Sequence, residues 1–232
     1  MGKLPPVNKR IPKTQLFING GLATAEREVI SDRIEEMRLK YVLNPHTYPL
    51  EVIKNSDEQY DLILFAEIWL KEIRPTERIS RLLQQAIPSA LVLIFRYEDE
   101  IQFSTALKRL NQNDRTAIVI TEYHTGNWMS LRSLTNDQQH FLKSISLDYL
   151  PALDYKQTYI HIHRQIYAER YASIVSEADE ADFDTVKLKT EQKIELLAEI
   201  ERLKKQLNMK GTSLREKVKL AGEIKRLESK FN

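Results

Sequence analysis

The stretch DLILFAEIWLK, residues 61–71, decides the fold of this chain. Successive side chains of a strand point to opposite faces of its sheet. Here both sets are largely apolar: Leu62, Leu64, Ala66, Ile68 and Leu70 on one face, and Ile63, Phe65 and Trp69 on the other, beside Glu67 and Lys71. A strand that is apolar on both faces is typical of a sheet covered on both sides. The sequence therefore predicts a central strand with helices packed on it.

The flanking segments predict an α+β domain around this strand. A helix at 76–87 leads to a second strand at 90–97, and this connection is long enough for a right-handed crossover between parallel strands. Later strands follow short turns and are predicted to be antiparallel, at 101–107, 117–123 and, as a short edge strand, 128–131. Further helices are predicted at 23–42, 136–146 and 154–176. We expect a mixed, mostly antiparallel sheet of four to five strands with packed helices.

The end of the chain, 185–232, predicts an antiparallel helical hairpin, a coiled coil of two helices. Apolar residues recur at spacings of four, three and four, the a/d repeat of coiled coils. Gly211 can end a helix, and Ser213 with Glu216 forms a capping box that begins another. The predicted packing residues are Leu196, Ile200, Leu203 and Leu207 against Leu214, Val218, Ala221, Ile224 and Leu227. The competing arrangement is one continuous helix through Gly211.

Charge divides the chain further. Residues 1–22 are predicted to be a basic arm kept extended by prolines, with Lys9, Arg10 and Lys13 as candidates for contact with phosphate or an acidic partner. The alternative is a solvated tail. Residues 23–176 form the predicted α+β domain. Residues 177–184 carry five acids and no base, which predicts a hinge before the hairpin at 185–232.

Composition excludes several kinds of protein. The chain has no cysteine, so disulfides, thiolate catalysis and cysteine-based zinc sites are excluded. A net charge of +2 does not by itself imply nucleic-acid or membrane binding. No Walker A or dinucleotide fingerprint is present, and no cofactor is predicted. With no visible signal peptide and no apolar run of membrane-spanning length, we expect a cytoplasmic protein.

The central strand also suggests a catalytic alternative. Asp61, Glu67 and Lys71 are weak candidates for a divergent metal-dependent nuclease, in which carboxylates bind magnesium and a lysine orients water. However, Lys71 is four residues from Glu67, about 13 Å at the rise of a strand. The alternative is that Glu67 pairs across the sheet. The histidines show no metal-ligand signature, because His161 and His163 are two apart in a predicted helix and face different ways.

Several short motifs occur in an order that resembles a known family. They are RIPK at 10–13, FAEIWLK at 65–71, AIP at 86–88, KR at 108–109, EIERLKKQL at 199–207 and EIKRL at 223–227. The chain resembles the uncharacterised bacterial family called domain of unknown function 4391. Members are often encoded beside DNA methyltransferases and helicases of restriction or phage-defence type. The resemblance therefore implies a small accessory subunit and supplies no catalytic residues.

Three hypotheses follow for the function. The leading one is a non-enzymatic adaptor that docks through its hairpin on a protein partner, a helicase or a DNA methyltransferase, and meets nucleic acid through that complex. The second is the nuclease that uses Asp61 and Glu67. The third is direct nucleic-acid binding by the basic arm and the hairpin, in which thirteen Lys and Arg outnumber seven Asp and Glu.

Overall fold

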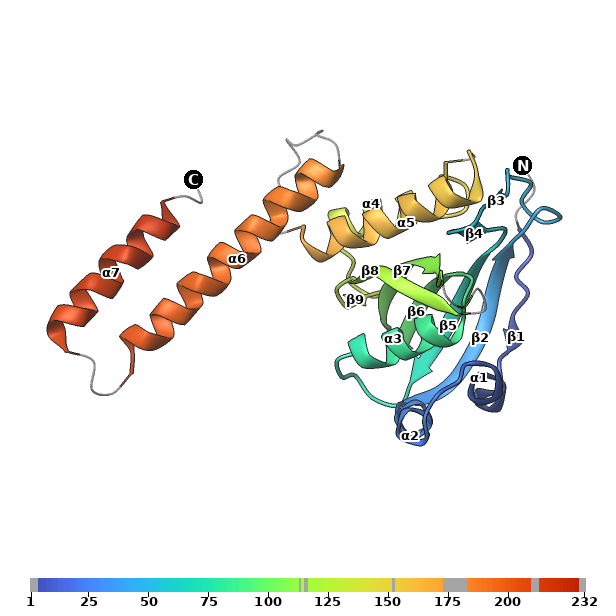
Figure 1. The fold of residues 1–232 in the computed structure, drawn as a ribbon, viewed down its shortest axis with the longest axis horizontal. Helices are drawn as coiled ribbons and strands as arrows, with labels where there is room; N and C mark the ends of the chain where they lie inside the picture. Colours follow the sequence, from blue (N-terminus) through green and yellow to red (C-terminus); the bar gives the residue numbers. More distant parts are fainter. Residues whose placement is uncertain are drawn as a thin grey trace. The chain divides into compact units, whose positions relative to one another are not determined.

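In its computed structural model the chain divides into two units, Met1–Arg170 and Tyr171–Asn232. The structure describes residues 4–112, 114, 117–151, 153–172, 183–209 and 213–229. The first unit is α+β and the second is a pair of helices (Figure 1). Among the described residues, no helix combines the length and the apolar character needed to cross a membrane.

A mixed sheet of seven strands forms the centre of the first unit, more strands than the four to five predicted. The strands are β1 (Lys9–Arg10), β2 (Ile34–Leu43), β5 (Ile63–Leu70), β6 (Ala90–Tyr97), β7 (Glu100–Leu110), β8 (Ile118–Thr125) and β9 (Met129–Ser130). Their order is β1-β2-β5-β6-β7-β8, and β9 pairs with β7. β5 and β6 are parallel, and the strands that follow β6 are antiparallel, as predicted. The pairs β1 with β2 and β2 with β5, which were not predicted, are also antiparallel. A separate hairpin joins β3 (Ile53–Lys54) to β4 (Gln59–Tyr60).

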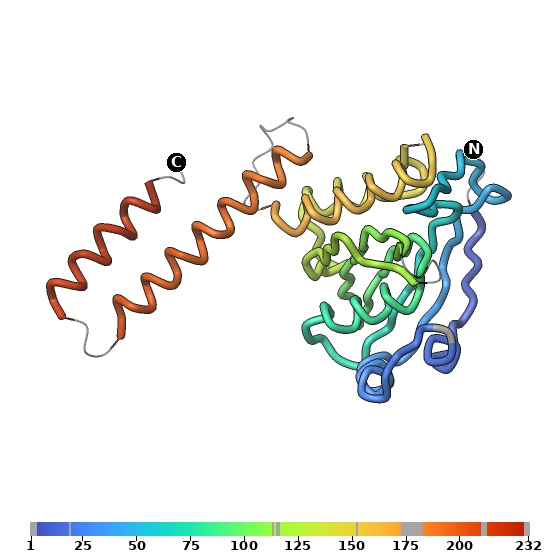
Figure 2. The backbone as a smooth tube through the Cα atoms, in the orientation of Figure 1, coloured from blue at the N-terminus to red at the C-terminus, as the bar shows by residue number. Residues whose placement is uncertain are grey.

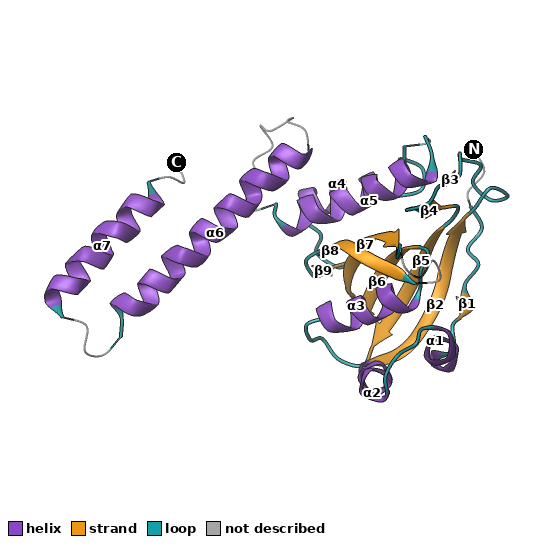
Figure 3. Cartoon of the chain, viewed as in Figure 1, coloured by secondary structure: helices purple, strands orange, loops and turns teal. Residues whose placement is uncertain are grey.

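Helices cover both faces of the sheet, which confirms the prediction drawn from residues 61–71 (Figure 3). The backbone trace in Figure 2 runs from β5 through α3 (Glu77–Ala86) to β6, the predicted crossover. Ala66, Ile68 and Leu70 of β5 pack in one cluster with α1 (Lys13–Asn19), α2 (Thr24–Arg33) and α3. Ile63 and Phe65 pack in the other with α4 (Asn136–Ser144) and α5 (Tyr155–Arg170).

The helix predicted at 23–42 is wrong in its second half. α2 ends at Arg33, and β2 begins at Ile34 and pairs with β5 through to Leu43. Ile34, Met37 and Tyr41 fit a helical face, but alternate residues of this segment are also apolar. The ladder to β5 supplies the backbone hydrogen bonds, so tertiary pairing overrides the helical pattern.

The predicted basic arm is part of the first unit rather than a separate extension. β1 pairs with β2, and α1 buries Leu16, while Leu22 is also buried. These apolar side chains join the cluster under α3, which fixes the segment against the sheet. The predicted acidic hinge lies outside the described residues except for Phe183 and Asp184, which begin a helix.

Within the described residues of the second unit there are two helices, α6 (Phe183–Leu207) and α7 (Leu214–Glu228). Ile200 and Leu203 of α6 form a buried cluster with Ile224 and Leu227 of α7. The predicted capping box is present, since the Ser213 hydroxyl accepts from the Glu216 amide. The packed pair is a helical hairpin and not the continuous helix that was its alternative.

Candidate functional site

Glu67 lies on β5 between two cations on the neighbouring strands. Its carboxylate is 3.4 Å from Lys40 Nζ on β2 and 3.2 Å from Arg96 Nε on β6. The Arg96 guanidinium also lies over the Trp69 ring, 5.3 Å from its centroid. Glu67 is only 7% exposed, and a carboxylate that is nearly buried requires such partners. This is the cross-sheet pairing that the sequence analysis gave as the alternative to a nuclease.

The other two candidate catalytic residues lie beyond the ends of the same strand. Asp61 precedes β5 and accepts a hydrogen bond from Gln59 Nε2 at 2.7 Å. Lys71 follows β5, and its Nζ donates to the Ser31 carbonyl at 3.0 Å. Asp61 and Glu67 are six positions apart in the sequence, which corresponds to roughly 20 Å at the rise of an extended chain. The structure therefore does not bring Asp61, Glu67 and Lys71 together around one metal position.

The three basic residues of the N-terminal segment differ in how free their side chains are to bind an outside phosphate or acidic partner. Lys13 Nζ donates to the carbonyls of Ile34 and Ser31, and burial, followed by the nearby charges of Lys71 and Arg10, lowers its pKa. Arg10 Nε lies 3.6 Å from the Glu36 carboxylate, although the Arg10 side chain is largely exposed. Lys9 is exposed on β1. Internal contacts thus engage Lys13 most, and a phosphate would have to compete with them.

The apolar seam of the hairpin matches the prediction on α6 and differs from it on α7. Leu196 and Leu207 are partly buried beside the cluster, as the a/d spacing predicts. On α7 the seam runs through Leu220, Ile224 and Leu227. An ion pair of 2.7 Å between Lys204 Nζ and the Glu228 carboxylate joins the same two helices.

Leu214 and Val218, which were predicted to pack in this seam, are exposed at 80% and 68%. The reason is geometric. At about 100° per residue, the face of Leu214, Val218 and Ala221 lies roughly 120° around the helix from the face of Leu220 and its seam partners. The residues predicted to pack on α7 therefore came from both faces, of which only the one with Ile224 and Leu227 contacts α6. In antiparallel order Leu220 meets the end of α6, so the first turns of α7 extend past the seam.

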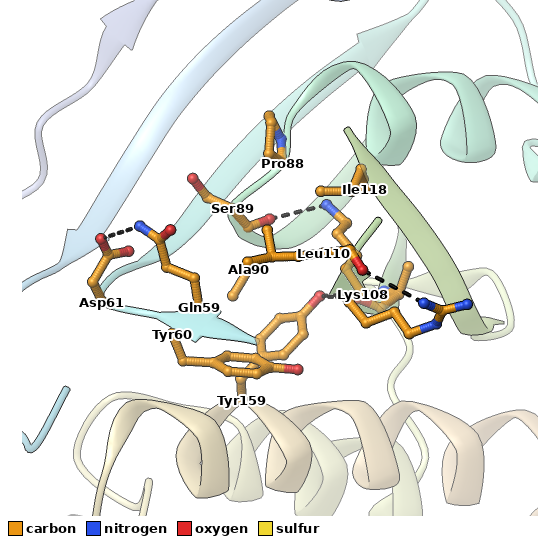
Figure 4. A pocket seen from close by; sticks show the side chains of 12 residues that line it. Gln59, Tyr60, Asp61, Pro88, Ser89, Ala90, Lys108, Leu110, Ile118 and Tyr159 are labelled. Atoms are coloured by element: carbon orange, nitrogen blue, oxygen red, sulfur yellow. Dashed lines mark hydrogen bonds between the residues drawn. The ribbon is translucent and has the colours of Figure 1, made fainter. Parts of the chain in front are cut away.

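Sequence reasoning did not identify Lys108, a partly buried lysine on β7 at a register irregularity. Its Nζ donates to the carbonyl of Ile87 at 2.6 Å. It also donates to the carbonyl of Ser89 at 2.9 Å (Figure 4). Burial lowers the pKa of Lys108 to about 7, so part of the population carries a neutral amine at neutral pH. No local signal singled it out, because the same strand carries other polar residues, among them Glu100, Gln102 and Arg109.

Lys108 lines a small cavity with Tyr60 and Tyr159 (Figure 4). Burial raises the pKa of Tyr60 to about 12 and raises that of Tyr159 as well, so both phenols stay protonated. The cavity volume is about 100 Å³, whereas sites for small molecules usually measure 300–1,000 Å³. Lys108 therefore serves first to hold the backbone between α3 and β6.

The lowered pKa of Lys108 predicts that the stability of the fold depends on pH. Its pKa is about 7 in the folded state against 10.5 unfolded, so above pH 7 the unfolded state binds more protons. The free energy of unfolding then rises with pH, by up to about 1.4 kcal/mol per unit. In urea denaturation between pH 7.5 and 9.5, we expect Lys108→Met to remove this rise. The exposed control Lys54→Met should keep it, and parallel profiles for wild type and Lys108→Met would contradict the prediction.

Comparison with known proteins identifies the family. The family model described as "Domain of unknown function (DUF4391)" matches residues 5–231. The chain belongs to this family. The DUF4391 match spans both units and confirms the resemblance drawn from the short motifs. Searches of the curated proteins and of the solved structures found no match.

Proposed function

We propose that this DUF4391 protein is a non-enzymatic adaptor that docks on a partner protein through the first turns of α7. The observation that carries the proposal is the exposed face of Leu214, Val218 and Ala221, at positions i, i+4 and i+7. This face is named the α7 docking face below. Helices that bind in a groove of a partner use anchors at this spacing.

The α7 docking face is well prepared for such binding. The capping box of Ser213 and Glu216 holds the first turn of α7 in helical form, so little order has to be gained on binding. The seam residues lie on a different face and keep the two helices paired. Docking can therefore occupy the exposed leucine and valine without opening the hairpin.

The basic residues beside the docking face indicate what kind of partner surface would fit it. Arg215 and Lys217 flank the docking face on either side, and both are exposed. A matching surface is an apolar groove with acidic residues at its rim, because complementary charges favour association and orient it. We propose a helicase or DNA methyltransferase of a bacterial DNA-modification or phage-defence complex as the protein that carries this groove, in keeping with the resemblance described above.

The test is co-expression of this protein with a helicase or DNA methyltransferase encoded beside it. Affinity purification and the dissociation constant of the complex between the two proteins then measure binding. We expect the double variant Leu214→Glu, Val218→Glu to weaken binding at least about 100-fold, because two central apolar anchors are lost. Its circular dichroism should stay unchanged, since both side chains are exposed. The matched control is Ala198→Glu, an apolar-to-acid change at an exposed position of α6.

Other occupants give different results. If a second copy of the chain fills the face, light scattering will show wild-type dimers that the double variant loses. If nucleic acid binds there, its affinity will fall with salt by a log-log slope of about −0.9 per phosphate contact. Binding of the double variant to the partner with wild-type affinity would refute docking through α7.

A further inference from the structure

Two histidines and a glutamate converge between the edge strand β8 and the helix α5. They are Glu122 and His124 on β8 and His163 on α5, and one potential ligand atom from each lies within 4.8 Å of the others. His163 is buried, and the other two are partly exposed. None of the three residues belongs to the docking face of α7 or lines the Lys108 cavity, so the function of the cluster is a separate question.

The fold explains why these side chains meet. Glu122 and His124 are two residues apart on one strand and therefore share a face. α5 packs against β8, where its His163 and Tyr167 rings contact the His124 ring, and His163 lies with Tyr159 and Ile162 on the buried side of that helix. The pairing of Thr105 with His124 places a threonine of β7 beside the cluster.

The distances suit a small coordination sphere. His124 Nε2 is 2.6 Å from Glu122 Oε1, and His163 Nε2 is 3.5 Å from the same oxygen. Ligand bonds to zinc of about 2.0–2.1 Å put the donor atoms of a tetrahedral site roughly 3.3 Å apart. All three ligand atoms lie within 4.8 Å of one another, so side-chain shifts of about 1–2 Å would bring the donors to this spacing.

The surroundings hold both imidazoles in place. The Thr105 hydroxyl lies 2.9 Å from His163 Nδ1, which fixes the ring and directs Nε2 toward Glu122. A hydrogen bond on the second nitrogen is the usual companion of a metal-bound histidine. The His124 ring contacts the rings of His163 and Tyr167, with centroid distances of 4.4 and 4.7 Å. The donors are thus oriented before any ion binds.

We propose that Glu122, His124 and His163 bind one divalent transition-metal ion, with Zn²⁺ as the reference ion. Two imidazole nitrogens and one carboxylate oxygen suit zinc and its neighbours, whereas calcium and magnesium prefer oxygen donors alone. Three protein ligands leave a coordination position for water or an outside ligand. The ion would also link the edge strand β8 to α5.

Calorimetric titration of Zn²⁺ into the full chain, first treated with chelator, tests the proposal. We expect one ion per chain and a thermal midpoint that rises with zinc concentration, since the ion binds the folded state. Glu122→Gln and His124→Gln should each lower the affinity more than 100-fold, and Thr105→Val about 10–100-fold. His161→Gln is the matched control, because its Nε2 lies 3.2 Å from the Ser144 carbonyl, away from the cluster.

Folding of each variant is checked by circular dichroism in the absence of metal, and the partly exposed Glu122 and His124 are changed first because His163 is buried. Co²⁺ bound to the wild type should give visible absorption bands that the two ligand variants lose. The proposal is overturned if the wild type binds no Zn²⁺ at micromolar concentration. It is equally overturned if Glu122→Gln and His124→Gln bind Zn²⁺ as the wild type does, which would leave a hydrogen-bonded structural cluster only.

Discussion

Leu203→Asp is expected to unfold the C-terminal hairpin while the first unit keeps its thermal transition. Leu203 is one of four buried residues in the seam between α6 and α7. Losing a buried leucine typically costs about 2–5 kcal/mol, and an unpaired carboxylate in its place adds a desolvation cost. Among the described residues the seam contains only four buried side chains, so no larger apolar core offsets the loss of one of them. The two apolar clusters of the first unit contain no residue of α6 or α7.

Hydrogen exchange measured by mass spectrometry separates the two units. The amides of α7 and of the second half of α6 should lose protection in Leu203→Asp, while those of β5 and β6 keep it. Leu197→Asp is the matched control, because this neighbouring leucine is exposed. The prediction fails if α7 stays protected in the Leu203 variant. A partner that docks on α7 should also be lost, since its docking face is then no longer helical.

Tyr159→Ala is expected to lower the stability of the first unit by about 3–5 kcal/mol, the usual cost of removing a buried aromatic side chain. Tyr159 is fully buried and packs on Tyr60. Its hydroxyl lies 2.9 and 3.0 Å from the carbonyls of Leu91 and Ala106, and it accepts from the Ala106 amide at 3.2 Å. This one side chain on α5 therefore connects to both β6 and β7.

Thermal unfolding and urea denaturation measure this effect. For a unit of this size the melting temperature should fall roughly 6–20 °C, at about 2–4 °C per kcal/mol. Tyr159→Phe isolates the hydroxyl and should cost about 1–3 kcal/mol, because buried backbone groups lose a partner. Tyr149→Ala serves as the control at an exposed tyrosine. Equal stabilities for Tyr159→Ala and this control would contradict the prediction, and equal stabilities for Tyr159→Phe and the wild type would show that the hydroxyl contacts are not significant.

Sequence alone determined those features that depend on near neighbours in the chain. Residues 61–71 are apolar on both strand faces, which was enough to predict a covered central strand. Ser213 and Glu216 are three residues apart, so their capping box could be identified directly. The a/d spacing of Leu196 to Leu207 likewise predicted the seam of α6. Each of these rests on spacings that the backbone geometry converts directly into contacts.

The tertiary structure decided what distant segments do to one another. Residues 34–43 satisfied both a helical and a strand pattern, and only pairing with β5 made them β2. The seam of α7 depended on where α6 ends, which left Leu214 and Val218 exposed. Glu122 and His124 meet His163 only because α5 packs on β8 and β7. A local sequence pattern does not determine such long-range contacts, because the free energy that selects them comes from packing and pairing between segments far apart in the chain.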